Sequence, residues 1–212
     1  MATTARFVKA ADNSRPHKSH RYDVFGPKIQ RNLTLFGLSQ VHTWLLLESD
    51  PSVLSYCERP MVAPETKPKL VVDFWAGYAG HDELWIVSRN PAPAADIGRS
   101  MPAFAQWAEA NKYAVRQLSP PAVIDDKVYL DNWGTIVREL SANRRYVKPA
   151  LLKSVREILE QPRPIAALCN LMSQEDPVLV RVAAYSLLHA GFASCADIAV
   201  MPLGPASLLE LA

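Results

Sequence analysis

Apolar and polar positions follow two different periods along the chain, and these periods predict its secondary structure. Helical spacing of apolar residues predicts helices, and short runs rich in β-branched and aromatic residues predict strands. The predicted order is strand 32–36, helix 40–48, strands 53–62, 67–78 and 83–89, helix 102–112, strand 113–118 and helix 130–141. Helices and strands in this order predict an α/β fold with mixed layers.

From Lys148 onward the pattern changes to helices. The predicted helices are 149–160, a second that opens at Pro164, and a third with Asp176 as its N-cap, Pro177 in its first turn and Gly191 at its end. An apolar tail at 192–203 follows. Three short helices and such a tail favour a winged-helix module, with a generic helical bundle as the alternative. The predicted organisation is thus an arm at 1–22, an α/β domain at 23–147 and a helical module at 148–212.

Positive charge is concentrated near the N-terminus, although the net charge of the chain is only +2. Residues 1–31 contain seven basic side chains against two acidic ones, and residues 1–22 lack hydrophobic periodicity. A basic, flexible arm of this kind follows a phosphate backbone by charge alone. A solvated, disordered tail accounts for the same composition, so both interpretations stay open.

Cysteine usage and hydropathy exclude several classes of protein. Cys57, Cys169 and Cys195 are odd in number and form no CxxC pair, so neither a disulfide framework nor a zinc cluster is predicted. The longest apolar runs are too short to cross a bilayer. Residues 1–16 also lack the apolar segment of a secretory signal. We therefore expect a cytoplasmic protein with no membrane contact.

Several segments match the pattern of one known family. The matching residues between 26 and 60 are Lys28, Arg31, Asp50, Pro51, Val53, Arg59 and Pro60. Further on, KLVVDF matches a strand that ends in Pro-Asp-Phe in that family, and the later helix and strand segments follow in the same order. From about residue 24 to the end, the chain resembles TnsA-type endonuclease subunits of heteromeric transposons. The segments are moderately specific when taken together.

The resemblance implies a restriction-endonuclease-like first domain, of the PD-(D/E)xK type, and a C-terminal winged helix. In that family the chemistry needs a carboxylate on the first helix, an Asp at a strand end and an acid-x-Lys pair on the next strand. The acids hold Mg²⁺, and the lysine helps to orient and deprotonate the attacking water. Magnesium takes oxygen ligands, preferably anionic ones, and stabilises charge during phosphodiester attack.

The positions that match this site are Gln40, Asp73, Ile86 and Ser88. Asp73 alone is acidic, and Ile86 cannot ligate a metal, so we expect neither a catalytic residue nor a resident metal, with Asp73 the one ligand if a metal is bound. The chain is therefore interpreted as a degenerate, non-cleaving member. The alternative is that both residues are purely structural. Gln40 then satisfies backbone groups in the first turn of a helix, and Asp73 caps a turn.

The resemblance also implies partners. The family's C-terminal module contacts an AAA+ ATPase regulator and helps to assemble the transposase complex. The third predicted helix of the module offers only Arg181, Tyr185 and His189, so it favours protein contact, or burial in its own domain, over reading DNA bases. The candidate contacts with double-stranded DNA are Arg21, Lys28 and Arg31.

Three functions compete at this stage. The first is a non-cleaving component that bridges a transposase subunit, an ATPase regulator and transposon-end DNA. The second is an active endonuclease that cuts the 5′ ends of a transposon, using Mg²⁺ or Mn²⁺ at a rearranged site of Asp73 with Asp82 or Glu83. The third is a free-standing DNA-binding regulator acting through residues 148–212, against which the sparse basic charge of that segment argues.

Overall fold

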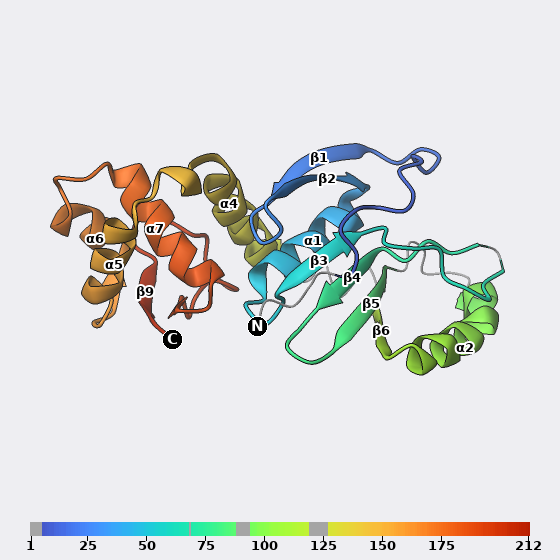
Figure 1. The fold of residues 1–212 in the computed structure, drawn as a ribbon. Coiled ribbons are helices and arrows are strands. Elements are labelled where there is room, and N and C mark those ends of the chain that lie inside the picture. Colours follow the sequence, from blue (N-terminus) through green and yellow to red (C-terminus); the bar gives the residue numbers. More distant parts are fainter. Residues whose placement is uncertain (1–5, 68, 88–93, 119–126) are drawn as a thin grey trace. The chain divides into compact units, whose positions relative to one another are not determined.

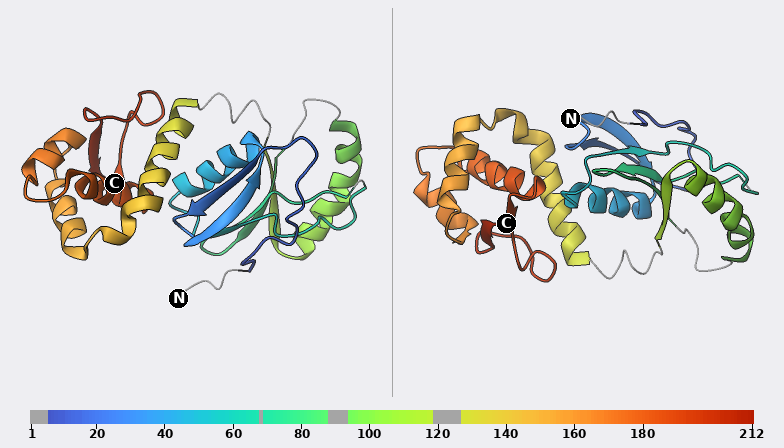
Figure 2. Two further views of the ribbon diagram at one scale, coloured as in Figure 1. Left: turned by 90° about the horizontal axis from the view of Figure 1, so that it is seen from above. Right: turned by 60° about the horizontal axis from the view of Figure 1, so that its bottom comes forward.

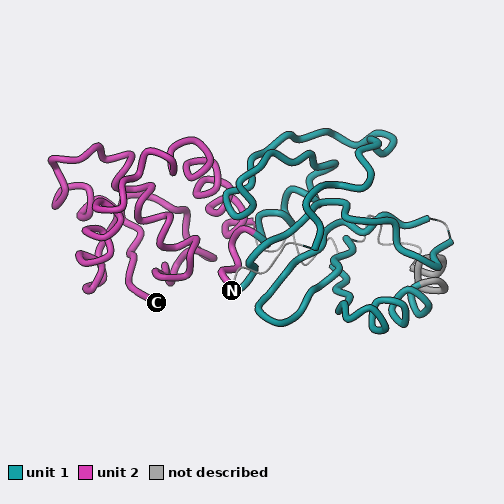
Figure 3. Tube along the Cα trace, viewed as in Figure 1, with its two compact units in different colours: residues 1–47, 52–125 teal, residues 48–51, 126–212 magenta. Residues whose placement is uncertain are grey.

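Two compact units make up the protein. The computed structural model describes residues 6–67, 69–87, 94–118 and 127–212. Unit 1 comprises residues 1–47 and 52–125, and unit 2 comprises residues 48–51 and 126–212 (Figure 3). Helices and a mixed sheet occur together, so the predicted α/β class is confirmed (Figures 1 and 2).

Unit 1 is built on a hairpin and a four-stranded sheet. Its elements are β1 (Arg21–Gly26), β2 (Arg31–Phe36), α1 (Leu38–Ser49, of which the last two residues belong to unit 2), β3 (Ser55–Glu58), β4 (Phe74–Gly77), β5 (Asp82–Val87), α2 (Ala94–Ala110) and β6 (Tyr113–Leu118). The hairpin β1–β2 is antiparallel, and the sheet has the order β3-β4-β5-β6. Strands β3, β4 and β5 run antiparallel, whereas β6, reached through α2, runs parallel to β5. From α1 onward this is the predicted order of helix, three strands, helix and strand.

The two faces of the sheet carry different side chains. Trp75 and Ile86 lie in a buried cluster with Phe104 of α2 on one face. On the other face, Tyr56 accepts a hydrogen bond from the Nε1 of Trp44 in α1 at 2.7 Å. Alternation along a strand separates these two sets, so α1 and α2 cover opposite faces.

The described part of the predicted flexible arm is packed against unit 1. Phe7 meets the ring of Trp75 edge to face, with centroids 5.8 Å apart. The N–H of Ala11 donates to the carbonyl oxygen of Arg59 at 2.9 Å. Arg21 already belongs to β1. Where a mobile arm was expected, ring contacts of the partly buried Phe7 with Trp75 and Tyr113 and a backbone hydrogen bond from Ala11 connect residues 6–22 to the rest of unit 1.

Unit 2 combines helices with a small three-stranded sheet. Its elements are α4 (Lys127–Asn143), the 3₁₀ turn η1 (Arg144–Tyr146), α5 (Pro149–Ile158), β7 (Arg163–Pro164), α6 (Ile165–Leu171), α7 (Pro177–His189), β8 (Ala193–Ser194) and β9 (Leu208–Leu211). The sheet order is β7-β9-β8, with both pairs antiparallel. The predicted cap is present, since the Oδ1 of Asp176 accepts from the N–H of Val178 at 2.7 Å. The predicted tail at 192–203 contains β8, and β9 lies beyond it.

The border between the units falls earlier than the pattern predicted. The division lies at residues 125 and 126 rather than at 147 and 148. Helix α4 therefore belongs to unit 2, where it packs along α7 and buries Trp133 and Ile136. Hydrophobic periodicity identified this helix but not the neighbour against which its apolar face packs.

The third helix of the module is an internal element of unit 2. Nine of the 13 residues of α7 are buried, including Tyr185 and His189. Arg181 forms a fork with Glu139 of α4, with Nε and Nη2 donating at 2.8 and 3.0 Å. Of the two roles left open for this helix, burial in its own domain is the one observed. No helix among the described residues has both the length and the apolar character needed to cross a membrane.

Candidate functional site

Asp73 lies at the point where the chain enters β4, and its backbone is hydrogen-bonded on both sides. Its N–H donates to the carbonyl of Trp85 at 3.0 Å, and its carbonyl accepts from the N–H of Arg59 at 2.8 Å. The carboxylate is equally engaged. Its Oδ1 accepts from Gln40 Nε2 at 2.6 Å, and its Oδ2 accepts from the N–H of Val87 at 2.8 Å. Asp73 is only 2% exposed, so this carboxylate is a buried, hydrogen-bonded group.

Gln40 connects this carboxylate to the start of α1. Its Oε1 accepts from the N–H of Phe36 at 2.8 Å, while its Nε2 donates to Asp73. Gln40 is 2% exposed. The structure therefore brings together two of the residues named from the sequence, and the amide of one satisfies the carboxylate of the other.

The remaining two positions of the predicted site do not join this pair. Ile86 lies in the apolar cluster under α2, on the face of the sheet opposite α1. Ser88 lies outside the described residues. Because Phe74 faces Trp85 in the sheet, Trp85 and Val87 are the β5 residues on the α1 side. Neither of these side chains supplies an anionic oxygen.

The donor set around Asp73 does not fit a catalytic divalent cation. Magnesium needs several oxygen ligands, preferably anionic. Both oxygens of the single carboxylate accept hydrogen bonds from N–H groups, and so does the amide oxygen of Gln40. Among the described residues, no three His, Cys, Asp or Glu side chains converge in a way that could hold a metal.

The acids proposed for a rearranged site lie at the other end of β5. Asp82 pairs with Gly77, whereas Asp73 is bonded beside Trp85 and Val87. Asp82 accepts from the Nη1 of Arg6 at 3.3 Å. Glu83 accepts from the Nε1 of Trp85 at 2.7 Å. Both acids thus belong to local contacts at the start of the strand.

Arg59 ties the N-terminal segment to the sheet beside Asp73. Its φ is +43°, an unusual value for a residue other than glycine. Its Nε donates to the carbonyl of Asp12 at 2.7 Å, and its Nη2 pairs with the carboxylate of Asp12. Hydrogen bonds from Ser14, followed by the contact with Arg59, hold the pKa of Asp12 below its ordinary value. The side chain of Arg59 is 4% exposed, so this is a nearly buried cation with a fixed partner.

Sequence reasoning named Arg59 only as part of a family match and did not find its partner. Asp12 lies 47 residues away. The available signal was a basic residue before a proline inside an apolar segment, which indicates a buried cation that requires a carboxylate. The sequence pattern does not say which carboxylate supplies the charge.

Two of the three side chains predicted to contact DNA form hydrogen bonds within unit 1. The Nζ of Lys28 donates to the carbonyl of Leu47 at 2.7 Å, near the end of α1. Arg31 forms a fork with Glu58, with Nη1–Oε1 and Nη2–Oε2 distances of 2.8 and 2.5 Å. These hydrogen bonds raise the pKa of Arg31. Arg31 also contacts Cys57, whose burial raises its thiol pKa to about 12, so this thiol is not a nucleophile at neutral pH.

Arg21 is the exposed member of the predicted set. Its side chain is 59% exposed and lies 3.0 Å from Asp23. A hydrogen bond from Thr34 and the contact with Arg21 lower the pKa of Asp23. The guanidinium of Arg21 is therefore reachable from solvent, but a carboxylate stands beside it.

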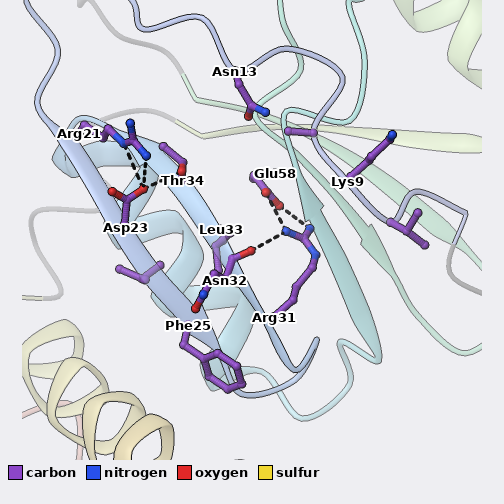
Figure 4. A pocket seen from close by; sticks show the side chains of 13 residues that line it. Lys9, Asn13, Arg21, Asp23, Phe25, Arg31, Asn32, Leu33, Thr34 and Glu58 are labelled. Atoms are coloured by element: carbon purple, nitrogen blue, oxygen red, sulfur yellow. Dashed lines mark hydrogen bonds and ion pairs between the residues drawn. The ribbon is translucent and has the colours of Figure 1, made fainter.

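A cavity of about 630 Å³ lies between the N-terminal segment and the hairpin (Figure 4). The pair Arg21–Asp23 lies on one side of it, and the pair Arg31–Glu58 lies on the other. Asn13 of the N-terminal segment also lines it. Each guanidinium is matched by a carboxylate, and Lys9 adds one further positive charge to the lining.

No family model matches the chain, and no curated protein matches it.

Proposed function

We propose that this chain acts in the cytoplasm as a non-cleaving, TnsA-like component of a DNA transposition complex. In this role it bridges a transposase subunit, an AAA+ ATPase regulator and double-stranded transposon-end DNA. The observation that carries the proposal is the buried pair of Gln40 and Asp73, in which the carboxylate is hydrogen-bonded by an amide and a backbone N–H. These residues occupy the positions that match the family's nuclease site, and their chemistry does not suit metal-assisted hydrolysis.

The order of elements in unit 1 supports a restriction-endonuclease-like domain. A helix, three antiparallel strands, a helix and a parallel strand follow one another, and the two helices cover opposite faces of the sheet. The helix that would supply the first carboxylate is α1, and the strand that would supply the Asp is β4. Gln40 lies near the start of α1, and Asp73 directly precedes β4.

The order of elements in unit 2 supports a winged-helix module. From α5 onward the chain forms a helix, a strand, two helices and two further strands, and the three strands make one sheet. The buried third helix favours a module that presents its other surfaces to a partner.

The competing function is an active endonuclease with an atypical metal site. In the β4–β5 register, Asp73 stands opposite the Trp85–Val87 end of β5. Asp82 lies four positions before Ile86 in this strand, which corresponds to about 13 Å at the usual rise of an extended strand. Asp82 and Glu83 therefore lie too far from Asp73 to share one cation with it. This distance favours the non-cleaving component.

The test uses the full-length chain with linear DNA that carries a transposon end. The DNA is incubated with the protein over a range of Mg²⁺ and Mn²⁺ concentrations, and nicks are mapped on both strands. We expect no cleavage above the level of the Asp73→Ala variant. Cleavage by the parent chain that this variant loses would reject the proposal in favour of the endonuclease.

A second arm tests the assembly role. The tagged chain is co-expressed with a transposase and an AAA+ ATPase from the same gene neighbourhood, and retained proteins are identified after affinity purification. We expect both partners to be retained in the presence of transposon-end DNA. Retention of neither partner would contradict the bridging role.

A further inference from the structure

The turn that directly precedes β1, at one end of the hairpin, carries several basic side chains (Figure 1). All of them are exposed: Arg15, His17, Lys18 and His20. Residues 13–20 contain no acidic residue and, apart from Pro16, no apolar one. We refer to residues 15–20 as the N-terminal turn. Its composition is that of a surface which meets a negatively charged group in water.

Hydrogen bonds give the N-terminal turn a defined shape. The N–H of Ser19 donates to the carbonyl of Pro16 at 3.1 Å, and the Nε of Arg15 donates to the carbonyl of Ser19 at 2.6 Å. The carbonyl of His20 accepts from the N–H of Gly37 at 2.9 Å, just beyond the end of β2. The basic side chains therefore project from an ordered segment, and a ligand does not have to order the chain in order to bind there.

The charges of Arg15 and Lys18 are not neutralised by any residue that the structure describes. The side chain of Lys18 has no hydrogen bond or ion pair within this part of the chain. Arg15 uses its Nε alone there, and the carbonyl that accepts from it carries no net charge. The acids that flank the turn, Asp12 and Asp23, are each paired with another arginine. Both cations are therefore available to an anion from outside the chain.

Lys18 has a backbone conformation in which glycine is the usual residue. Its φ is +59°, in the left-handed region that residues with a side chain seldom adopt. Lys18 is also the third residue of the hydrogen-bonded turn 16–19, a position where glycine is common for this reason. A lysine here costs the fold free energy that no contact of its side chain returns. Such strain under an unpaired charge indicates a role in binding.

We propose that the N-terminal turn binds the phosphate backbone of duplex DNA through Arg15 and Lys18. Arginine holds phosphate oxygens in a bidentate manner, and lysine attracts them as a point charge. The turn has no exposed apolar side chain that would enter a lipid surface, which favours a nucleic acid over a membrane. The contact acts through charge, so it depends on salt more than on base sequence. The choice of DNA as the polyanion rests on the proposed function.

The experiment measures the binding of the full-length chain to a labelled DNA duplex at several salt concentrations. The test variant is Lys18→Gly. Loss of one phosphate contact makes the slope of log K against log salt concentration shallower by about 0.9, and binding at about 50 mM salt falls roughly 10-fold. Urea unfolding should give a midpoint equal to or above that of the parent chain, because glycine adopts a positive φ without strain. Weaker binding without a loss of stability is not expected of a purely structural residue.

The matched control is Lys112→Gly, which removes the same charge from the same backbone conformation elsewhere in unit 1. Lys112 is exposed, has a φ of +61°, and its side chain has no partner among the described residues. We expect its slope to equal that of the parent chain. Arg15→Lys should keep most of the slope, because the charge remains. Arg15→Gln combined with Lys18→Gly should make the slope shallower by about 1.8, twice the effect of one contact.

Equal slopes for Lys18→Gly and Lys112→Gly would overturn the inference, and so would a parent chain that does not bind the duplex. Binding to phosphatidylserine vesicles that Lys18→Gly loses, without binding to the duplex, would also overturn it. The readout is separate from those of the proposed function, which are cleavage and the retention of partner proteins. Binding of DNA by the turn can be present when the partners are not retained, and it can be absent when they are.

Discussion

The N-terminal part of unit 1 and residues 140–156 of unit 2 are both rich in basic side chains but differ in the acidic side chains within them. In unit 1, Arg31 and Arg59 are each bound to a carboxylate, and Lys28 is bound to a backbone carbonyl. In unit 2, residues 140–156 contain no acidic side chain. A basic side chain is available to an outside anion only when the fold places no carboxylate beside it. Counting charges along the sequence does not distinguish the two cases.

Each unit also contains a buried polar group that is hydrogen-bonded within the unit. In unit 1, Gln40 and Asp73 satisfy each other and the adjoining backbone. In unit 2, Asn132 binds the loop before β9. Its Nδ2 donates to the carbonyls of Ile198 and Met201 at 2.8 and 2.7 Å, and its Oδ1 accepts from the N–H of Leu203 at 2.7 Å. Both groups are structural in their contacts, although only the first matches a catalytic position in the resembling family.

The largest effect is expected from Gln40→Glu, which puts a second carboxylate against Asp73. Two carboxylates at hydrogen-bond distance cannot both ionise, so the folded pair keeps a proton that the unfolded chain releases above about pH 4.3. The folded pKa is thus raised, and the stability of the variant falls as pH rises. We expect a loss of about 3 kcal/mol at pH 7 and about 1 kcal/mol or less at pH 4. Urea unfolding at both pH values measures it, and a loss that is independent of pH would contradict the geometry.

Arg59→Met is expected to have the next largest effect. It removes the partner of Asp12 and the hydrogen bond to the Asp12 carbonyl. Breaking a buried ion pair costs about 3–5 kcal/mol, and access of water to Asp12 reduces this to about 2–3 kcal/mol. Urea unfolding gives the loss, and limited proteolysis should show faster cleavage before residue 20. Arg21→Met is the control. An unchanged cleavage rate in Arg59→Met would show that the contact between Arg59 and Asp12 does not hold residues 6–22 in place.

Asn132→Ala tests the corresponding contact in unit 2. It leaves two carbonyls and one N–H without this partner, with an expected loss of about 2 kcal/mol. Hydrogen exchange should become faster at Leu203 and its neighbours, while α7 keeps its protection. Thr135→Ala, on the exposed surface of the same helix, is the control. Equal exchange rates at Leu203 in the parent chain and in Asn132→Ala would show that Asn132 does not hold the loop before β9.

The smallest effect is expected from Arg21→Gln. This exposed pair with Asp23 should leave the urea midpoint unchanged, because such pairs are screened by solvent. Low-salt DNA binding should weaken only slightly, because Asp23 stands beside the guanidinium. A large loss of DNA binding from Arg21→Gln would show that a guanidinium beside a carboxylate is still available to DNA and would contradict the comparison.

Local periodicity predicted much of the fold, and long-range pairing accounts for what it missed. The order from α1 to α4 and the cap at Asp176 follow from spacing and residue type over a few positions. The strand β1 and the packed segment before it were not predicted, since their stability comes from β2, Trp75 and Arg59. The border of unit 2 was missed because the apolar face of α4 indicates burial without indicating the neighbour.

The candidate site was also predicted only in part, because its contacts depend on pairing between distant segments. The resemblance identified Gln40 and Asp73 as corresponding positions, and the structure brings them together. Ile86 lies on the other face of β5, in the apolar cluster under α2, because successive side chains of a strand point to opposite faces. The hydrogen bond from Val87 to Asp73 could not be predicted, since it depends on the backbone register between β4 and β5.

The most direct test of the central claim is a titration of the full-length chain with Mn²⁺, followed by electron paramagnetic resonance and compared with Asp73→Asn. The carboxylate of Asp73 is already hydrogen-bonded by Gln40 and Val87. We therefore predict the same weak Mn²⁺ binding by both proteins, with and without transposon-end DNA. Stoichiometric binding that Asp73→Asn abolishes would contradict the claim that this site no longer holds a catalytic metal.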